Sequence, residues 1–133
     1  MNEPAFLTVD EVLRIQARSL AEHGGTEGVH DAGLVDSAVA SAKNTFCYGG
    51  GDLFDVAASY AFHLAEAQAF LDGNKRTGVA AALVFLARNG VYVAPPKWEF
   101  YLAMIAIAEK RLTKTGLADL LRRQAAPTHE PES

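Results

Sequence analysis

Cysteine, long apolar runs and an excess of positive charge are all scarce in this sequence. Cys47 is its one cysteine, which excludes an internal disulfide framework and is typical of a reducing cytoplasm. The longest apolar stretches, near 79–87 and 102–108, are too short to span a bilayer. The N-terminus is acidic and carries no basic-then-apolar signal segment. We therefore expect a cytoplasmic protein that does not associate with a membrane.

The charge balance argues against a protein that wraps nucleic acid. Twelve basic residues stand against 16 acidic ones, for a formal charge of −4, whereas neutralising phosphates needs a positive surface. Basic residues do gather in one C-terminal group, which consists of Lys110, Arg111, Lys114, Arg122 and Arg123. Nucleic-acid binding through this C-terminal basic group is a hypothesis that the composition disfavours but leaves open.

What the sequence does contain is helical periodicity. Half of its 133 residues are apolar, which suits one soluble domain over residues 1–124, followed by a short polar tail over 125–133 that we expect to be disordered. Strand signals are few. Apolar spacing, capping residues and breakers predict helices over residues 9–22, 32–42, 55–67, 74–88, 97–111 and 115–124. The sequence predicts an all-α fold, a compact bundle with one small flap loop or hairpin over 44–53, where three glycines oppose a helix.

The segment QAFLDGNKR, residues 68–76, carries the chemistry. It opens a predicted helix, where unpaired N–H groups and the positive end of the helix dipole attract phosphate. Gly73 has no Cβ to hold a ligand away from the backbone, and Lys75 and Arg76 add positive charge where the dipole disfavours it. Asp72 is a hard oxygen ligand suited to Mg²⁺. Taken alone, these residues fit an anion site and a plain helix cap with solvated cations about equally well.

The longer segment 60–90 resembles the core of the Fic/Doc superfamily, and its death-on-curing (Doc) branch in particular. The family pattern is His-x-Phe-x-Asp/Glu-Ala/Gly-Asn, followed by Gly or Lys and then Arg. This chain matches the pattern at Phe70, Asp72, Gly73, Asn74, Lys75 and Arg76. Residues 28–46 also look like the Doc segment upstream of this motif, so the resemblance covers about residues 6–93. It implies a Fic-like helical bundle.

The resemblance also implies roles for these residues. ATP and Mg²⁺ would be the cofactors, with Asp72 as the metal ligand and Arg76 stabilising charge on the transferring phosphates. The implied nucleotide-binding residues are Phe70, Gly73, Asn74, Lys75 and Arg76. Lys75 stands where AMP-transferring members have glycine, and Val79 stands where they have a second arginine. Both features favour the Doc branch, whose founding toxin transfers the terminal phosphate of ATP to a threonine of elongation factor Tu.

Two partners follow from the same resemblance. A target protein would dock by strand addition on a flap, which we assign to residues 44–53 with Tyr48, Gly49, Gly50 and Gly51 at its tip. A separate antitoxin protein is also implied, because the sequence lacks the family's inhibitory motif Ser/Thr-x-x-x-Glu-Gly/Asn.

One departure from the family pattern matters: Gln68 occupies the position of the motif histidine, the general base. An amide cannot take up a proton near neutral pH, and losing a general base typically lowers a rate by about 10²–10⁴-fold. His63, five residues earlier, is an alternative base, although such a histidine is more often a core residue; Glu66 is a weaker candidate. Two hypotheses therefore lead: a Doc-like toxin that transfers a phosphate or nucleotide to a protein hydroxyl, and a catalytically silent module that binds a nucleotide or a partner.

Overall fold

The computed structural model describes residues 3–26, 28–93 and 97–125, and within them the chain is a bundle of six helices. Among these residues, extended backbone pairs only in two isolated antiparallel bridges, Val29 with Phe70 and Val93 with Ala125. The predicted all-α fold is confirmed. The helices are α1 (Val9–His23), α2 (Ala32–Cys47), α3 (Leu53–Ala67), α4 (Asn74–Arg88), α5 (Lys97–Ala108) and α6 (Lys114–Gln124). Apart from Ala125, the predicted tail lies outside the described residues.

Local side chains fix where the helices begin. At α1, the Thr8 hydroxyl accepts a hydrogen bond from the Glu11 N–H (3.1 Å), and the Glu11 carboxylate accepts one from the Thr8 N–H (2.9 Å). Asp52 and Asp55 form the same reciprocal capping box at α3. Because Asp52 is the cap, α3 begins two residues before the predicted start at residue 55.

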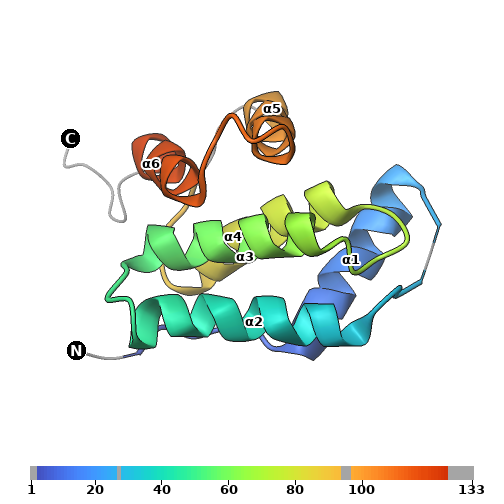
Figure 1. Cartoon of the computed structure of the whole chain (residues 1–133), viewed down its shortest axis with the longest axis horizontal. Helices are drawn as coiled ribbons and strands as arrows, with labels where there is room; N and C mark the ends of the chain where they lie inside the picture. The colour runs from blue at the N-terminus through green and yellow to red at the C-terminus, as the bar shows by residue number, and fades with distance from the viewer. Residues whose placement is uncertain (1–2, 27, 94–96, 126–133) are drawn as a thin grey trace, which may run out of the picture.

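The centre of the bundle is α3, which packs against α2 and α4 along its length while α5 and α6 cover a further side (Figure 1). Its buried residues include Val56, Tyr60 and Leu64, which are completely inaccessible to solvent. Small residues let the helices approach closely: a Cβ on Gly78 of α4 would lie 2.8 Å from the Ala61 carbonyl oxygen of α3. Within the described residues, every helix is too short or too polar to serve as a membrane span.

The first four residues of the predicted flap are helical, which corrects the sequence-based boundary of α2. The helix continues through Cys47, five residues beyond the predicted end at residue 42. Phe46 explains the extension, because its ring packs edge-on against Phe6 with the ring centroids 6.0 Å apart. Only Tyr48 and the glycines that follow make the turn into α3. Tertiary packing thus outweighs the helix-breaking tendency of the nearby glycines.

Candidate active site

Two residues in the left-handed backbone conformation bracket the motif loop, residues 68–73. Gln68 has φ 53° and ψ 45° and ends α3, while Gly73 has φ 76° and ψ 21° and precedes α4. A non-glycine residue in this region is uncommon. The two reversals turn the chain sharply, so that the end of α3 and the start of α4 lie at the same end of the bundle (Figure 1).

Asn74 and Phe70 fix the shape of the motif loop. The Asn74 side chain accepts a hydrogen bond from the Phe70 N–H and donates one to the Phe70 carbonyl oxygen, both at 3.0 Å. Both polar atoms of the Asn74 amide are therefore engaged, and its contact with phosphate stays a prediction. The Phe70 side chain is 2 % exposed. Because the ring is buried in the core, any contact between Phe70 and a nucleotide would have to come from its backbone.

A second segment, residues 24–31, closes over the loop, and we call it the clasp; residue 27 within it lies outside the described residues. The Ala69 carbonyl oxygen accepts hydrogen bonds from the N–H groups of His30 (2.6 Å) and Asp31 (3.1 Å). The Leu71 N–H donates to the Gly28 carbonyl oxygen at 3.1 Å. Together with the Val29–Phe70 bridge, these contacts make the clasp the structural neighbour of the motif loop.

The structure does not bring the predicted flap to this site. Tyr48, Gly49, Gly50 and Gly51 precede the first turn of α3, whereas Gln68 follows its last turn. A helix of 15 residues is about 22 Å long at 1.5 Å per residue. Figure 1 shows the α2–α3 turn and the α3–α4 loop at opposite ends of the bundle. These four residues therefore lie away from the motif loop, because a local glycine signal does not specify which end of a helix hairpin it occupies, and their role in docking a target stays a prediction.

The start of α4 has free donors. Where the structure describes the residue before a helix, side chains cap the helix start at Thr8, Asp31, Asp52 and Thr113. Gly73 makes no such bond, and the first turn of α4 contains no acidic residue. The first helical bond runs from the Thr77 N–H to the Gly73 carbonyl oxygen at 2.8 Å. Three backbone N–H groups, those of residues 74–76, precede it and can bind an anion.

Two buried side-chain atoms in this first turn have no hydrogen-bond partner among the described residues, Nε of Arg76 and Oγ1 of Thr77. The Arg76 guanidinium donates only a long hydrogen bond, 3.5 Å from Nη2 to the Gly24 carbonyl oxygen. A buried polar group without a partner costs about 1–3 kcal/mol. A phosphate oxygen at the helix start would supply the acceptor that the guanidinium lacks.

Asp72 is suited to hold Mg²⁺ beside such a phosphate. Its carboxylate is exposed, and its oxygens accept hydrogen bonds from the Gly73 N–H (2.9 Å) and, more weakly, the Thr26 N–H (3.3 Å). Each oxygen keeps a lone pair for a cation. The described residues contain no cluster of three or more metal-binding side chains. A single carboxylate nevertheless fits Mg²⁺, which is usually held by one or two carboxylates, water and substrate phosphates.

A small pocket of about 140 Å³ lies between the end of α3, the start of α4 and the end of α5. It brings together Gln68 and Lys75, as the sequence predicts, and it adds Glu66 and Lys110. Apolar residues complete the lining: Ala65, Met104, Ile107 and Ala108. Lys110 follows α5 in a left-handed conformation with φ 64°. We call this the lysine pocket; no local sequence signal links Lys110 to a motif 35 positions earlier.

Comparison with known proteins decides the family. Residues 6–86 match the model of the Fic/DOC family, which is more than half of the 133-residue chain. The chain belongs to the Fic/DOC family. The match runs from the residues before α1 into α4 and includes the whole motif loop. α5 and Lys110 lie beyond it, so one wall of the lysine pocket is outside the part of the chain that the Fic/DOC model covers.

Two curated relatives carry Doc names. The chain is 30 % identical over 118 residues to "Protein kinase doc" of Escherichia phage P1, which covers 88 % of this chain and 93 % of the phage protein. It is 47 % identical over 92 residues to "Toxin Doc" of Mycolicibacterium smegmatis, which covers 67 % of this chain and 68 % of that protein. The predicted resemblance to the Doc branch of the Fic/DOC family is confirmed.

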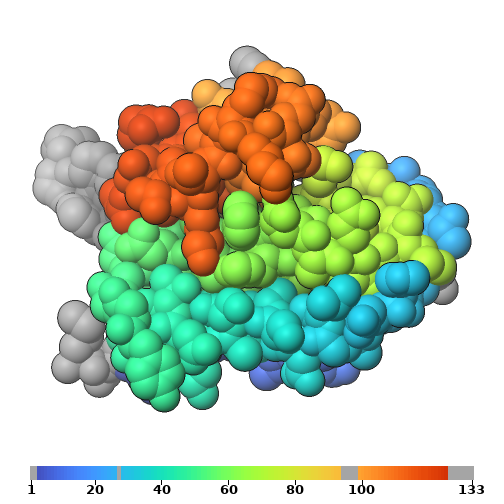
Figure 2. Space-filling model, viewed as in Figure 1, coloured from blue at the N-terminus to red at the C-terminus, as the bar shows by residue number. Residues whose placement is uncertain are grey.

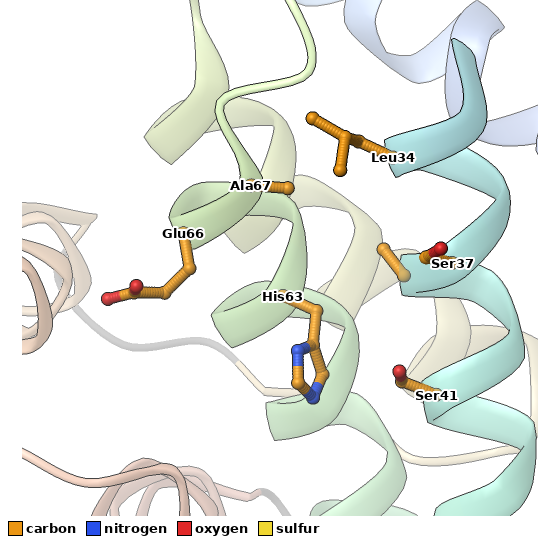
Figure 3. Close-up of a pocket in the computed structure, with 7 residues that line it drawn as sticks. Leu34, Ser37, Ser41, His63, Glu66 and Ala67 are labelled. Carbon is orange, nitrogen blue, oxygen red and sulfur yellow. The ribbon is translucent and has the colours of Figure 1, made fainter. Parts of the chain in front are cut away.

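His63, the alternative base, faces away from the motif loop of this Fic/DOC fold. It lines a separate pocket of about 250 Å³ between α2 and α3, where Figure 3 shows its ring beside Ser41 while Glu66 points the other way. Its Nε2 accepts a hydrogen bond from the Lys114 ammonium at 3.0 Å. Burial, followed by the nearby Lys114 charge, lowers the pKa of His63. The structure does not place His63 in the pocket that Gln68 and Lys75 line.

Two residues of the C-terminal basic group, Arg111 and Arg122, pair with acidic residues. Arg122 lies 2.9 Å from an Asp52 oxygen and 2.6 Å from an Asp119 oxygen. Arg111 pairs with Glu109 at 2.6 Å. A guanidinium group that is paired with a carboxylate of the same chain does not neutralise nucleic-acid phosphates. The arrangement weakens the nucleic-acid hypothesis and assigns Arg122 to holding α6 against the start of α3.

Proposed function

We propose that this Fic/DOC-family chain is a Doc-like toxin that transfers a phosphate, or a nucleotide, from ATP to a hydroxyl group of a target protein. The observation that carries the proposal is the uncapped start of α4, where free N–H groups coincide with Lys75 and Arg76. Such a helix start binds phosphate through its donors and its dipole. The relatives named as a toxin and as a protein kinase support the same conclusion.

In this proposal the chain's own residues bind and orient the phosphates. Arg76 donates hydrogen bonds from its forked guanidinium, including the buried Nε that has no partner among the described residues. Lys75 reaches the phosphates from the lysine pocket. Asp72 would hold Mg²⁺, which neutralises phosphate charge when it is bound. Phosphoryl transfer depends mainly on such positioning and charge stabilisation.

The clasp, rather than residues 48–51, is then the surface on which the target docks. Val29 is extended in its bridge with Phe70 and is 43 % exposed, and the neighbouring Leu71 is 55 % exposed. Exposed apolar side chains beside extended backbone suit a peptide that adds as a strand. Elongation factor Tu is the first target to test, and a separately encoded antitoxin is the partner that would restrain the toxin in the cytoplasm.

A catalytically silent module is the second candidate, and Gln68 is the observation that favours it. Gln68 lines the lysine pocket with its amide, which binds hydrogen-bond partners but takes up no proton near neutral pH. Such a protein would keep the phosphate site and bind ATP or a partner protein without turnover.

Labelled ATP separates these functions. The chain is incubated with Mg²⁺, purified elongation factor Tu or a bacterial lysate, and ATP labelled at either the γ or the α phosphate. We expect γ label on a protein if phosphate is transferred, and α label if a nucleotide is transferred. Asp72→Ala and Lys75→Ala should abolish the signal, whereas Lys43→Ala should retain it, because Lys43 lies on α2 away from the loop.

The silent module predicts a different pattern. Neither label would appear on protein, while ATP would still bind to the wild-type chain and less tightly to Lys75→Ala. If ATP binding were also absent, or unchanged by Lys75→Ala, the phosphate site itself would be excluded. Binding of RNA or DNA that falls steeply with salt would instead restore the nucleic-acid hypothesis.

A further inference from the structure

The lysine pocket contains a proton acceptor that the family motif does not supply. The Gln68 amide cannot take up a proton near neutral pH, and the ammonium groups of the two lysines are donors without an acceptor atom. The apolar residues from α3 and α5 take no part in proton transfer. Glu66 is therefore the one lining side chain that can act as a base.

The Glu66 carboxylate is also exposed to solvent and has no side-chain partner among the described residues. It lies on the last turn of α3, two residues before Gln68, and is exposed. Glu66 also lines the α2–α3 pocket, and Figure 3 shows its carboxylate directed away from His63. Among the described residues, Glu66 makes no ion pair or side-chain hydrogen bond. The same is true of Lys75 and Lys110, which line the pocket with it. In Figure 2, the layer made by α5 and α6 covers part of α3.

The position of Glu66 opposes the helix dipole. The C-terminal end of a helix is negative, so an acidic residue in the last turn is unfavourable and a basic one is favoured. α3 has no basic residue in its last turn to compensate. A carboxylate kept at an unfavourable helix end, without an ion-pair partner, beside two ammonium groups and the phosphate site, has the arrangement of a reactive group rather than a structural one.

We propose that Glu66 is the general base of this chain, and that it accepts the proton of the target hydroxyl in place of the missing motif histidine. This inference rests on the proposed transfer from ATP. The target oxygen forms a bond to phosphorus, and the bond from phosphorus to the leaving phosphate oxygen breaks. The leaving group, ADP for phosphate transfer, takes the electron pair, and the hydroxyl proton moves to the Glu66 carboxylate.

The two lysines of the pocket allow a carboxylate to lie close to a bound phosphate. Phosphate and carboxylate repel each other, and the ammonium groups of Lys75 on α4 and Lys110 after α5 reduce that repulsion. His63 and its partner Lys114 are further titratable groups near Glu66. Burial and the Lys114 charge lower the pKa of His63, and the Glu66 charge opposes them. Protein kinases likewise use a carboxylate to accept the substrate hydroxyl proton.

The test compares initial transfer rates of the wild type, Glu66→Gln, Gln68→His and the double variant that carries both changes. Glu109→Gln is the matched control, because it removes the same charge from the residue next to Lys110. Glu109 pairs with Arg111 and does not line the lysine pocket. ATP binding and thermal stability are measured for each variant. Because Glu66 is exposed at an unfavourable helix end, Glu66→Gln should fold at least as stably as the wild type.

We expect Glu66→Gln to lower kcat by about 10²-fold or more with little change in ATP affinity, which is the usual loss for a general base. The double variant should regain transfer, and its rate should fall below about pH 6.5, where imidazole is protonated. The wild-type rate should not show this imidazole-dependent fall, because the wild type has no histidine at position 68.

Other outcomes overturn the inference. Transfer by Glu66→Gln at the wild-type rate would show that another group, or none, takes the proton. An inactive wild type beside an active Gln68→His variant would show that the phosphate site works but Glu66 does not serve as the base. If no variant transfers label although all bind ATP, the proposed transferase function fails, and Glu66 fails with it.

Discussion

Replacing Gly78 by alanine tests the closest approach between α3 and α4. An added Cβ would lie 2.8 Å from the Ala61 carbonyl oxygen and 3.3 Å from its Cα. Both are backbone atoms, which cannot rotate aside as a flexible side chain can. The two helices would have to separate, and the start of α4, which carries Lys75 and Arg76, lies less than one turn away.

The size of the effect follows from two opposing contributions. Alanine in a helix interior is favoured over glycine by about 1 kcal/mol. Overpacking a tightly packed site costs about 1–3 kcal/mol, and a contact with rigid backbone on both sides belongs in the upper part of that range. We expect a net loss of about 1–2 kcal/mol in the free energy of unfolding. For a chain of 133 residues this lowers Tm by about 4–8 °C.

Thermal unfolding followed by circular dichroism measures this loss, and Gly116→Ala in α6 is the control. There the added Cβ would lie 2.6 Å from Leu112 Cδ1, the far end of a side chain that can move. Gly116→Ala should therefore leave Tm nearly unchanged or raise it. Gly78→Ala should also weaken ATP binding more than Gly116→Ala does. If the two variants are equally stable, the reasoning from the α3–α4 contact is refuted.

Three further predictions concern stability and its dependence on pH. Tyr60→Phe should cost about 1–3 kcal/mol, because the buried Leu7 N–H loses the hydroxyl it donates to at 2.8 Å; an unchanged urea midpoint would contradict this. The Arg88 guanidinium hydrogen-bonds to Glu11 and lowers the pKa of that carboxyl to about 2 from 4.5, so its stabilisation holds above about pH 4.5 and is lost toward pH 2. Arg88→Met should flatten this acid limb of Tm. Burial lowers the pKa of His63 below 6.5, so stability should fall as pH drops through about 6.5, and His63→Gln should remove that step.

The helices were predictable because their signals are local. Thr8 and Glu11 form the predicted capping box, and the helix that the pattern places over 9–22 spans Val9–His23. The fourth helix likewise covers the predicted residues 74–88. Boundaries failed where distant contacts decide them, as at Phe46, whose packing on Phe6 extends α2 beyond the predicted end.

The candidate site was predictable only in its contiguous part. Residues 72–76 are close in sequence, and helix-start physics together with the family resemblance makes them a candidate anion site. The Asn74 amide holds the Phe70 backbone, a structural role that the sequence did not indicate, and its contact with phosphate stays a prediction. The clasp and Lys110 enter the site through contacts across long sequence separations, for which one sequence carries no signal.

The clasp holds the motif loop through main-chain atoms, and this has a consequence for how the protein can evolve. The Ala69 carbonyl oxygen is bound by the N–H groups of His30 and Asp31, atoms that almost every residue possesses. Gly28 is constrained, because its φ of +141° is strained for any residue that has a Cβ. The exposed side chains of Val29 and His30 carry no such constraint. Mutation can therefore change the exposed surface of the clasp while the motif loop keeps its shape. If the clasp docks a target as proposed, new targets can be acquired without a change in the motif itself.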